Sequence, residues 1–247
     1  MIKIKTDEEI KLIRKSCEVT KLTLEMLSKE VKPGVTTKHL DKLAYDFITS
    51  QGCKPAFKGL YGFPATICAS VNDEVVHGIP GDRVLNEGDI ISIDTGAVYK
   101  GYYSDAARTF PVGKVSSNVK KLIDITEKSF FEGIKGIKEG SYVGDISSAV
   151  QKFAEKYGYG IVRELTGHGL GKELHEDPSI PNFGVKGSGA RLNANMVLAI
   201  EPMINMGNRN VVFMPDGWTC KTLDGKPSCH YENTVLITKD GVEILTL

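Results

Sequence analysis

The sequence lacks most of the features that mark secreted, membrane-spanning and nucleic-acid-binding proteins. Its 247 residues include five cysteines, an odd number with no C-x-x-C pair, so we expect free thiols instead of a disulfide framework or a thiolate zinc site. The 31 basic and 31 acidic residues cancel, and a chain without net charge has no overall field that would attract nucleic acid or an anionic membrane surface. The expected partner is therefore a small molecule or a peptide.

Recognisable targeting segments are also missing. No apolar run is long enough to span a bilayer, so we expect no membrane association. The opening residues, MIKIKTDEEI, place acids among isolated apolar residues, which fits neither a secretory signal nor a transit peptide. We therefore expect a cytoplasmic protein, and its 41% content of hydrophobic residues is enough for a substantial core.

Hydrophobic periodicity predicts two helices followed by strands. Thr6 and Glu9 form a capping box, after which apolar residues recur at steps of three and four up to a Lys-Pro-Gly stop. A second amphipathic helix is expected over 36–52. Segments 65–76 and 89–110 are rich in Ile, Val and Tyr and are interrupted by turn residues, which predicts strands.

The second half repeats this order. Apolar residues from Val119 to Ile137 predict a helix that stops at Gly140, a second helix follows over 146–157, and further strands come after it. The run LNEGDIISID, which ends at Asp94, recurs 107 positions later as LNANMVLAIE, which ends at Glu201. We predict an internal duplication with a carboxylate at the end of equivalent strands; chance recurrence of common apolar residues is the alternative.

Four acidic residues are the candidates for the chemistry. Asp94 closes an apolar strand and Asp105 follows a predicted turn, so on two arms of a hairpin the pair can face each other or lie diagonally. Glu201 ends the equivalent strand, and Glu232 precedes an alternating one. If the halves face each other, these carboxylates converge, and because like charges repel, two divalent cations would compensate them. Such cation pairs activate water for hydrolysis, whereas a surface salt bridge is the alternative for any single acid.

Three histidines lie close to glycines. His168 and His175 belong to TGHGLGKELHEDP, and His77 lies in VVHGIP. Their spacing matches no established metal motif, so each ring is either structural or part of a site. The glycines also resemble a phosphate-binding loop, but the Lys-Ser or Lys-Thr pattern of such loops is missing.

These segments together resemble the type I methionine aminopeptidases. The similarity is carried by CASVNDEVVHGIP, LNEGD, TGHGLG, HEDP, IEP, DGWTCKT and YENT, and it runs over almost the entire chain. It implies an α+β pita-bread (creatinase/aminopeptidase) fold, in which two pseudo-symmetric α/β halves combine an antiparallel sheet with helices outside. We therefore predict a single catalytic domain over residues 1–247, with pseudo-repeats of about 1–112 and 113–247.

The resemblance also implies an activity: removal of the N-terminal methionine from nascent proteins, with a preference for a small second residue, by water activated at a dinuclear metal centre. Asp94 would chelate one ion, His168 and Glu201 would bind the other, and Asp105 and Glu232 would bridge both. Co, Mn, Fe, Zn and Ni all suit one imidazole and four carboxylates, so the two divalent ions are not identified further. Glu201 would also serve as the general base.

Other residues are expected to bind the substrate. By the same resemblance, His175 would hydrogen-bond the scissile carbonyl or its oxyanion, and His77 would hydrogen-bond the backbone amide on the leaving side. A dry slot for the methionine side chain would be lined by Phe63, Cys68, Leu174 and Trp218.

Two residues depart from the family pattern. Leu174 occupies a position where phenylalanine is common, and His230, two residues before Glu232, occupies one where glutamine is common. The first difference leaves the shape of the slot open, and the second leaves open whether His230 adds a ligand or a pH response. The reactivity of Cys68 and Cys229 is open as well.

Two alternatives are kept. One is another pita-bread peptidase, of the Xaa-Pro type, or a creatinase-like amidinohydrolase; such relatives normally carry a long amino-terminal domain before the first catalytic-type helix. The other is a non-catalytic binding homologue that has lost its metals. The 33 residues from His168 to Glu201 leave no room for the helical insertion of type II methionine aminopeptidases. The expected partners are the N-termini of nascent polypeptides, with ribosome association inferred from that substrate, and the expected state is a monomer.

Overall fold

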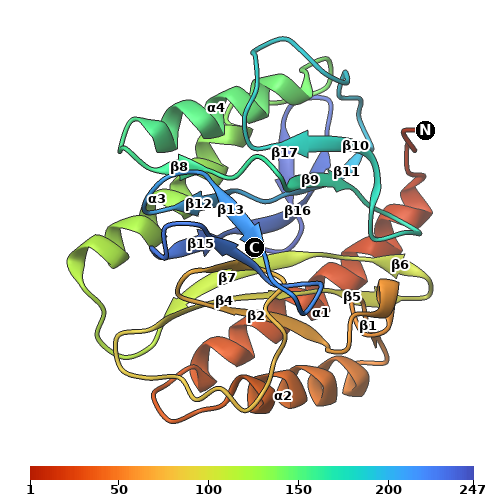
Figure 1. The fold of residues 1–247 in the computed structure, drawn as a ribbon. Coiled ribbons are helices and arrows are strands. Elements are labelled where there is room, and N and C mark those ends of the chain that lie inside the picture. Colours follow the sequence, from red (N-terminus) through yellow and green to blue (C-terminus); the bar gives the residue numbers. More distant parts are fainter.

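The computed structural model describes residues 1–247, with an order of helices and strands that occurs twice along the chain. Helices α1 (Asp7–Glu30) and α2 (Thr37–Ser50) come before the strands of the first half, and α3 (Ser117–Ile134) and α4 (Val143–Glu155) come before those of the second half. In Figure 1, α2 runs along the bottom of the view and α4 along the top, with the strands between them. None of the helices combines the length and the apolarity needed to cross a lipid bilayer.

An eight-stranded antiparallel sheet forms the centre of the molecule. Its order is β10-β9-β11-β16-β7-β4-β2, with β17 paired to β16. Strands from the two halves meet where β7 pairs with β16. The bounds are β2 (Ile67–Val71), β4 (Ile90–Thr95), β7 (Ala106–Pro111), β9 (Thr166–Gly169), β10 (Glu176–Pro181), β11 (Val197–Ile200), β16 (Glu232–Ile237) and β17 (Val242–Ile244).

Three small sheets of three strands each extend the central sheet. Their orders are β1-β5-β6, β15-β12-β8 and β13-β14-β3. A short 3-10 turn, η1 (Leu60–Gly62), follows β1. The bounds are β1 (Lys54–Pro55), β3 (Glu74–Val76), β5 (Ala97–Tyr99), β6 (Tyr102–Tyr103), β8 (Gly160–Ile161), β12 (Met203–Asn205), β13 (Val211–Phe213), β14 (Cys220–Thr222) and β15 (Ser228–His230).

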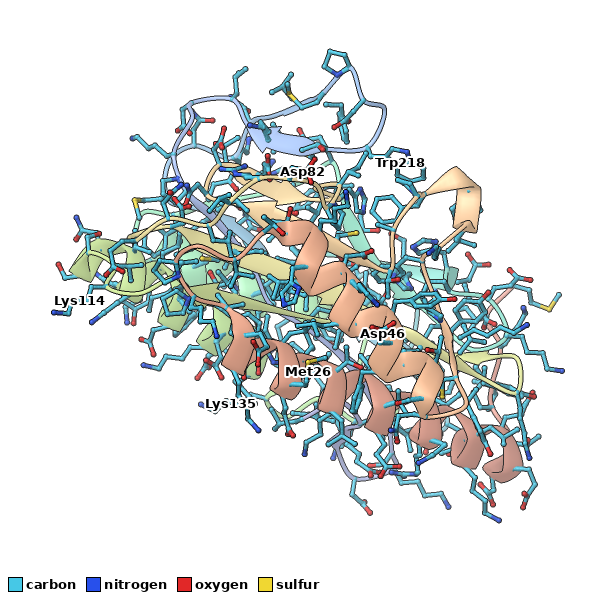
Figure 2. The ribbon with its side chains drawn as sticks, turned by 90° about the horizontal axis from the view of Figure 1, so that it is seen from below. Met26, Asp46, Asp82, Lys114, Lys135 and Trp218 are labelled. Atoms are coloured by element: carbon cyan, nitrogen blue, oxygen red, sulfur yellow. The ribbon has the colours of Figure 1, made fainter.

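The first two helices begin and pack as their sequences predict. The side chain of Thr6 caps α1 and Glu9 returns the contact to the Thr6 backbone, which confirms the capping box. Leu24 and Leu27 of α1 belong to one buried cluster with Ile93 of β4, and residues of α2 join it. Figure 2 shows α1 and α2 side by side, crossing the sheet on the same face. Burial of these apolar stripes therefore fixes the helices to the first half of the sheet.

The second pair of helices differs from its prediction at the ends: α4 begins at Val143 and ends at Glu155, so Tyr157 lies in the turn after it, and α3 is shorter than expected. Phe130 of α3 and Ile146 of α4 form a buried cluster with strands β11 and β16. The predicted helix through Ile137 is too long, because α3 ends at Ile134 and Gly136 adopts a φ of 75°. Ile137 still packs into the same cluster from the turn that follows. The spacing of Ile137 in the sequence therefore reflected its burial and not a place in the helix.

We expect Phe130→Ala to destabilise the fold strongly. The ring is fully buried in the cluster of the second half, and deletion of a buried aromatic side chain costs about 3–5 kcal/mol because a cavity remains. The measurement is the free energy of unfolding from urea titration. Phe213→Ala is the matched control, since that ring is 55% exposed and its loss should change the free energy by less than about 0.5 kcal/mol. Equal effects of the two substitutions would contradict the packing described.

Candidate metal centre and substrate cavity

Five adjacent strands of the central sheet supply the five predicted ligands. Asp94 lies in β4, Asp105 comes directly before β7, Glu232 begins β16, Glu201 follows β11, and His168 lies in β9. Because these strands are neighbours, the hydrogen-bond ladder brings together residues that are far apart in the sequence. The structure thus places all five side chains at one site.

The register of the strands sets the spacing of the acids. Asp94 and Glu232 both lie directly opposite Ala107, one on each side of β7, so all three side chains point to the same face. The alanine between the two acids leaves the space above it open. Asp105 lies two residues before Ala107, which places it diagonally from Asp94, one of the two arrangements that the hairpin interpretation allowed.

A contact of Nδ1 with the backbone orients the imidazole of His168 so that Nε2 points toward the acids. Its Nδ1 lies 3.0 Å from the carbonyl oxygen of Gly169, while Nε2 lies 3.6 Å from Asp105 Oδ2 and 3.7 Å from Glu201 Oε1. The flanking glycines are required here, because a Cβ at Gly167 would lie 2.4 Å from a backbone oxygen of β11. Strand β9 therefore approaches its neighbours closely and presents one nitrogen to the carboxylates.

Burial opposes the ionisation of the acids. It raises the pKa of Asp94 to about 7 and that of Glu201 to about 8. Burial, together with the charge of the neighbouring carboxylates, raises the pKa of Asp105 and Glu232 well above the ordinary value. Four ionised carboxylates at this site would repel one another, so positive charge is needed if they are to ionise together.

The donor set fits divalent cations. Three carboxylate oxygens, one each from Asp94, Asp105 and Glu232, are buried without a hydrogen-bond partner. Two groups of ligand atoms, each within 4.8 Å, share Glu232: one adds Asp105 and His168, and the other adds Asp94 and His230. Unpartnered buried oxygens beside imidazole nitrogens are the chemistry of a metal centre.

One cavity of about 200 Å³ is lined by all eleven residues that the sequence assigned to the site. Besides the ligands it is lined by His77, His175 and the four predicted slot residues. It is also lined by Phe57, Leu60 and Tyr61, which the sequence analysis missed. The only signal for them is a run of aromatic and aliphatic residues around Gly59 and Gly62, both at positive φ, with Phe57 before Gly59 and Leu60 and Tyr61 between the two glycines.

The apolar end of the cavity adjoins the acids directly. Cys68 in β2 lies opposite Asp94 in β4, and burial raises the pKa of its thiol well above the ordinary value, which keeps it protonated. Phe63 and Trp218 meet edge to face, with ring centroids 5.0 Å apart. Leu174 is buried in the same cluster. In Figure 2, Trp218 lies toward the outer edge of the molecule, away from α1.

The two remaining histidines line the cavity as neutral rings. Burial lowers the pKa of His77 to about 4 and also lowers that of His175. His77 follows β3 with a φ of 60°, a left-handed conformation that is uncommon outside glycine and is found at functional sites. His175 packs edge-on against His168 at 4.5 Å between centroids and stacks with Tyr61 at 5.9 Å. A neutral imidazole can both donate and accept a hydrogen bond.

A buried ion pair next to His175 was also missed. Lys5 Nζ lies 2.6 Å from Glu176 Oε2, and both side chains are almost fully buried. The backbone N–H of Lys172 donates to the other carboxylate oxygen at 3.0 Å. The segment before α1 therefore holds the loop between His168 and His175. No local pattern could reveal this contact, because its partners are 171 residues apart.

Comparisons with known proteins point to one family. The model of "Metallopeptidase family M24" matches residues 11–239. The chain is 53% identical over 247 residues to a methionine aminopeptidase of Clostridium perfringens, and the match covers 100% of this chain and 99% of the relative.

Solved structures give the same result. The crystal structure of methionine aminopeptidase from Rickettsia prowazekii is 42% identical, with a TM-score of 0.98 and complete coverage of both chains. An Xaa-Pro dipeptidase from Bacillus anthracis is 26% identical with a TM-score of 0.80, and only 61% of its length is covered. The similarity therefore extends over the whole length of the first protein but over part of the second.

We expect the metal-free protein to lose stability as pH rises from about 6.5 to about 8. The folded-state pKa values of Asp94 and Glu201, about 7 and about 8, exceed those of acids in an unfolded chain. The folded state therefore binds more protons than the unfolded state in this window, so the free energy of unfolding falls with rising pH until these protons have been released. The buried histidines have the opposite effect between about pH 4, to which burial lowers the pKa of His77, His168 and His230, and their unfolded-state pKa of about 6.5, so this effect fades as the pH rises above 6.5.

The measurement is the urea midpoint of chelator-treated protein at both pH values. Saturating divalent cation should remove the decrease, because it compensates the carboxylates. Glu201→Gln should reduce the decrease, whereas Glu25→Gln, an exposed glutamate of α1, should not. A midpoint of the metal-free protein that stays constant or rises over this window would show that the carboxylates are already ionised.

Proposed function

The chain belongs to metallopeptidase family M24, and from this membership and the geometry of the cavity we propose that it removes the amino-terminal methionine from newly made polypeptides. It is a methionyl aminopeptidase with the α+β pita-bread fold that the sequence implied. The observation that carries the proposal is that one cavity joins a cluster of four carboxylates and an imidazole to an apolar slot. The acids provide for hydrolysis, and the slot provides for a single apolar side chain.

We assign two divalent cations to the carboxylate cluster, as Co, Mn, Fe, Zn or Ni. Asp94 would hold one, His168 and Glu201 the other, and Asp105 and Glu232 would be shared. When bound, the ions polarise a carbonyl and lower the pKa of a water molecule. The support is the set of buried, unpartnered oxygens in the shared positions.

The remaining steps are assigned to side chains of the chain itself. Glu201 lies at the cavity with 13% of its side chain exposed, so it can take a proton from water and pass it to the leaving amine. His175 would donate a hydrogen bond to the scissile carbonyl oxygen as negative charge develops there. His77 would accept a hydrogen bond from the backbone amide on the leaving side, and its left-handed backbone fixes the ring at the cavity.

The slot would select methionine by burying its side chain. Phe63, Cys68, Leu174 and Trp218 form an apolar surface beside Asp94, close to where the substrate amine would lie. An unbranched, polarisable side chain fits such a surface well. We propose that a small second residue is preferred, as in the family that the sequence resembles.

Two alternative functions have less support than the removal of methionine. An Xaa-Pro peptidase is disfavoured because the chain matches the full length of methionine aminopeptidases but 61% of the Xaa-Pro dipeptidase. A non-catalytic homologue is disfavoured because all predicted ligands are present and converge in one cavity.

The enzyme acts on the N-termini of nascent proteins. We further propose that residues 1–247 work as one catalytic domain with pseudo-repeats of about 1–112 and 113–247, since pairs of helices precede strands in both halves. A cytoplasmic monomer that associates with ribosomes is the form of the enzyme that we propose, because its substrate emerges there.

Removal and return of the metal test the proposed function. The chelated protein should release no methionine from Met-Ala and Met-Gly peptides, and Mn or Co should restore release, with little release from Met-Lys peptides. Glu201→Ala and His77→Ala should abolish it, whereas Glu25→Ala and His39→Ala, exposed residues of α1 and α2, should not. Equal cleavage of peptides that begin with other residues would contradict the assignment.

Trp218→Ala should weaken substrate binding more than catalysis. Loss of one wall of the slot removes apolar burial of about 1.5–3 kcal/mol, which corresponds to a KM raised roughly 10- to 150-fold for methionine peptides. The value of kcat should change little, because this contact is the same in the ground state and the transition state. Phe213→Ala, an exposed ring of β13, is the control. A fall in kcat at unchanged KM would place Trp218 elsewhere in the reaction.

A further inference from the structure

The carboxylate of Glu201 lies between two imidazoles. Its Oε1 is 3.7 Å from His168 Nε2, and its Oε2 is 3.5 Å from His230 Nε2. The same nitrogen of His230 lies 3.8 Å from Glu232 Oε2. These distances exceed those of direct hydrogen bonds, so each imidazole faces a gap between carboxylates.

His230 is the most deeply buried histidine of the site. Its side chain is 2% exposed, and neither ring nitrogen has a hydrogen-bond partner. A buried polar group without a partner costs about 1–3 kcal/mol, so such a ring needs something else to bind. His230 does not line the cavity of the carboxylate cluster and borders a separate one beside Thr109 and Tyr231, but its Nε2 faces Glu201 and Glu232 at 3.5 and 3.8 Å.

The backbone holds this ring toward the acids. His230 ends β15 and Glu232 begins β16, two residues later on an extended stretch, so both side chains point the same way. The hydroxyl of Thr109 accepts a hydrogen bond from the backbone N–H of His230 at 3.0 Å and donates one to the backbone carbonyl of His230 at 2.9 Å. Met203 pairs with His230 on the other side. The position of the imidazole is therefore determined by the sheet.

The spacing around His230 repeats the spacing around His168. Two donors that each lie about 2.0–2.2 Å from a shared ion are roughly 3.0–3.6 Å apart at ordinary coordination angles. The contacts of His168 with Asp105 and Glu201, at 3.6 and 3.7 Å, and that of His230 with Glu232, at 3.8 Å, lie at or just above the upper end of this range. Asp94, His230 and Glu232 also place their ligand atoms within 4.8 Å of one another.

We propose that His230 is a sixth protein ligand, which gives an imidazole nitrogen to the cation position of Asp94 and Glu232, so that each of the two positions has one imidazole. This inference rests on the proposed function, because it requires the metal centre. The competing role for His230 is that of a hydrogen-bond donor that only holds Glu201. The two roles differ in the number of imidazoles bound to metal.

A second imidazole changes which ions the site prefers. Nitrogen ligands suit Fe, Co, Ni and Zn, whereas Mn is well served by carboxylate oxygens. The loss of His230 should therefore weaken the binding of Co and Zn more than that of Mn. A residue that merely positions Glu201 would affect all of these ions alike.

Proton NMR of the protein loaded with two equivalents of Co(II) counts the imidazoles. Each bound ring contributes one strongly shifted resonance from its remaining N–H, and this signal disappears in D₂O. We expect two such signals from the unaltered chain and one from His230→Gln. The matched control is His39→Gln, an exposed histidine of α2, which should retain both signals.

The outcomes separate this inference from the proposed function. A single signal in the unaltered chain, or two in His230→Gln, would overturn the role of His230 while leaving the metal centre intact. No signal at all would overturn both. The count from the unaltered chain does not depend on whether a variant folds.

Calorimetric titration provides the second measurement. In His230→Gln we expect one of the two binding steps for Co and Zn to weaken at least about tenfold, with a smaller change for Mn. The thermal midpoint of the metal-free variant checks that the chain is folded. Equal weakening of Mn, Co and Zn, or none, would assign His230 to positioning instead of ligation.

Discussion

The repulsion between buried carboxylates is the constraint on which the rest of this structure depends. The sheet places Asp94 and Glu232 on either side of Ala107 and Asp105 on the diagonal, and burial raises the pKa of each acid. A site of this kind is costly for the metal-free fold, because ionised groups without partners destabilise it. The apolar clusters that fix the helices to the sheet must offset this cost, so the fold sacrifices some stability to keep the acids close.

Part of this arrangement could be predicted from local sequence. Thr6 and Glu9 predict the start of α1. The repeated segment that ends at Asp94 and again at Glu201 predicts that these two acids occupy equivalent positions in the two halves. Periodicity could not tell whether Asp105 faces Asp94 or lies diagonally, because that depends on the register of β4 and β7. It also extended α3 to Ile137, since a buried residue in a turn has the same spacing as one in a helix.

Other contacts lay beyond any local pattern. The pair of Lys5 and Glu176 forms only when the segment before α1 reaches the start of β10, and the stacking of Tyr61 on His175 likewise joins distant segments. Such contacts are decided by the tertiary fold, whose long-range pairings a single sequence does not display. The family resemblance supplied the residues of the centre, and the structure adds what surrounds them.

The register between β2 and β4 ties the apolar slot to the carboxylate cluster. Cys68, on the wall of the slot, lies directly opposite Asp94, so the apolar surface and the acid belong to one cross-strand pair. A slip of one residue between these strands would turn either the slot residue or the acid to the other face of the sheet. Such a slip would also separate Ile91 and Ile93 from the leucines of α1 and α2, which makes it costly. The packing on the helix side of the sheet therefore keeps the apolar slot aligned with the carboxylates on the other side.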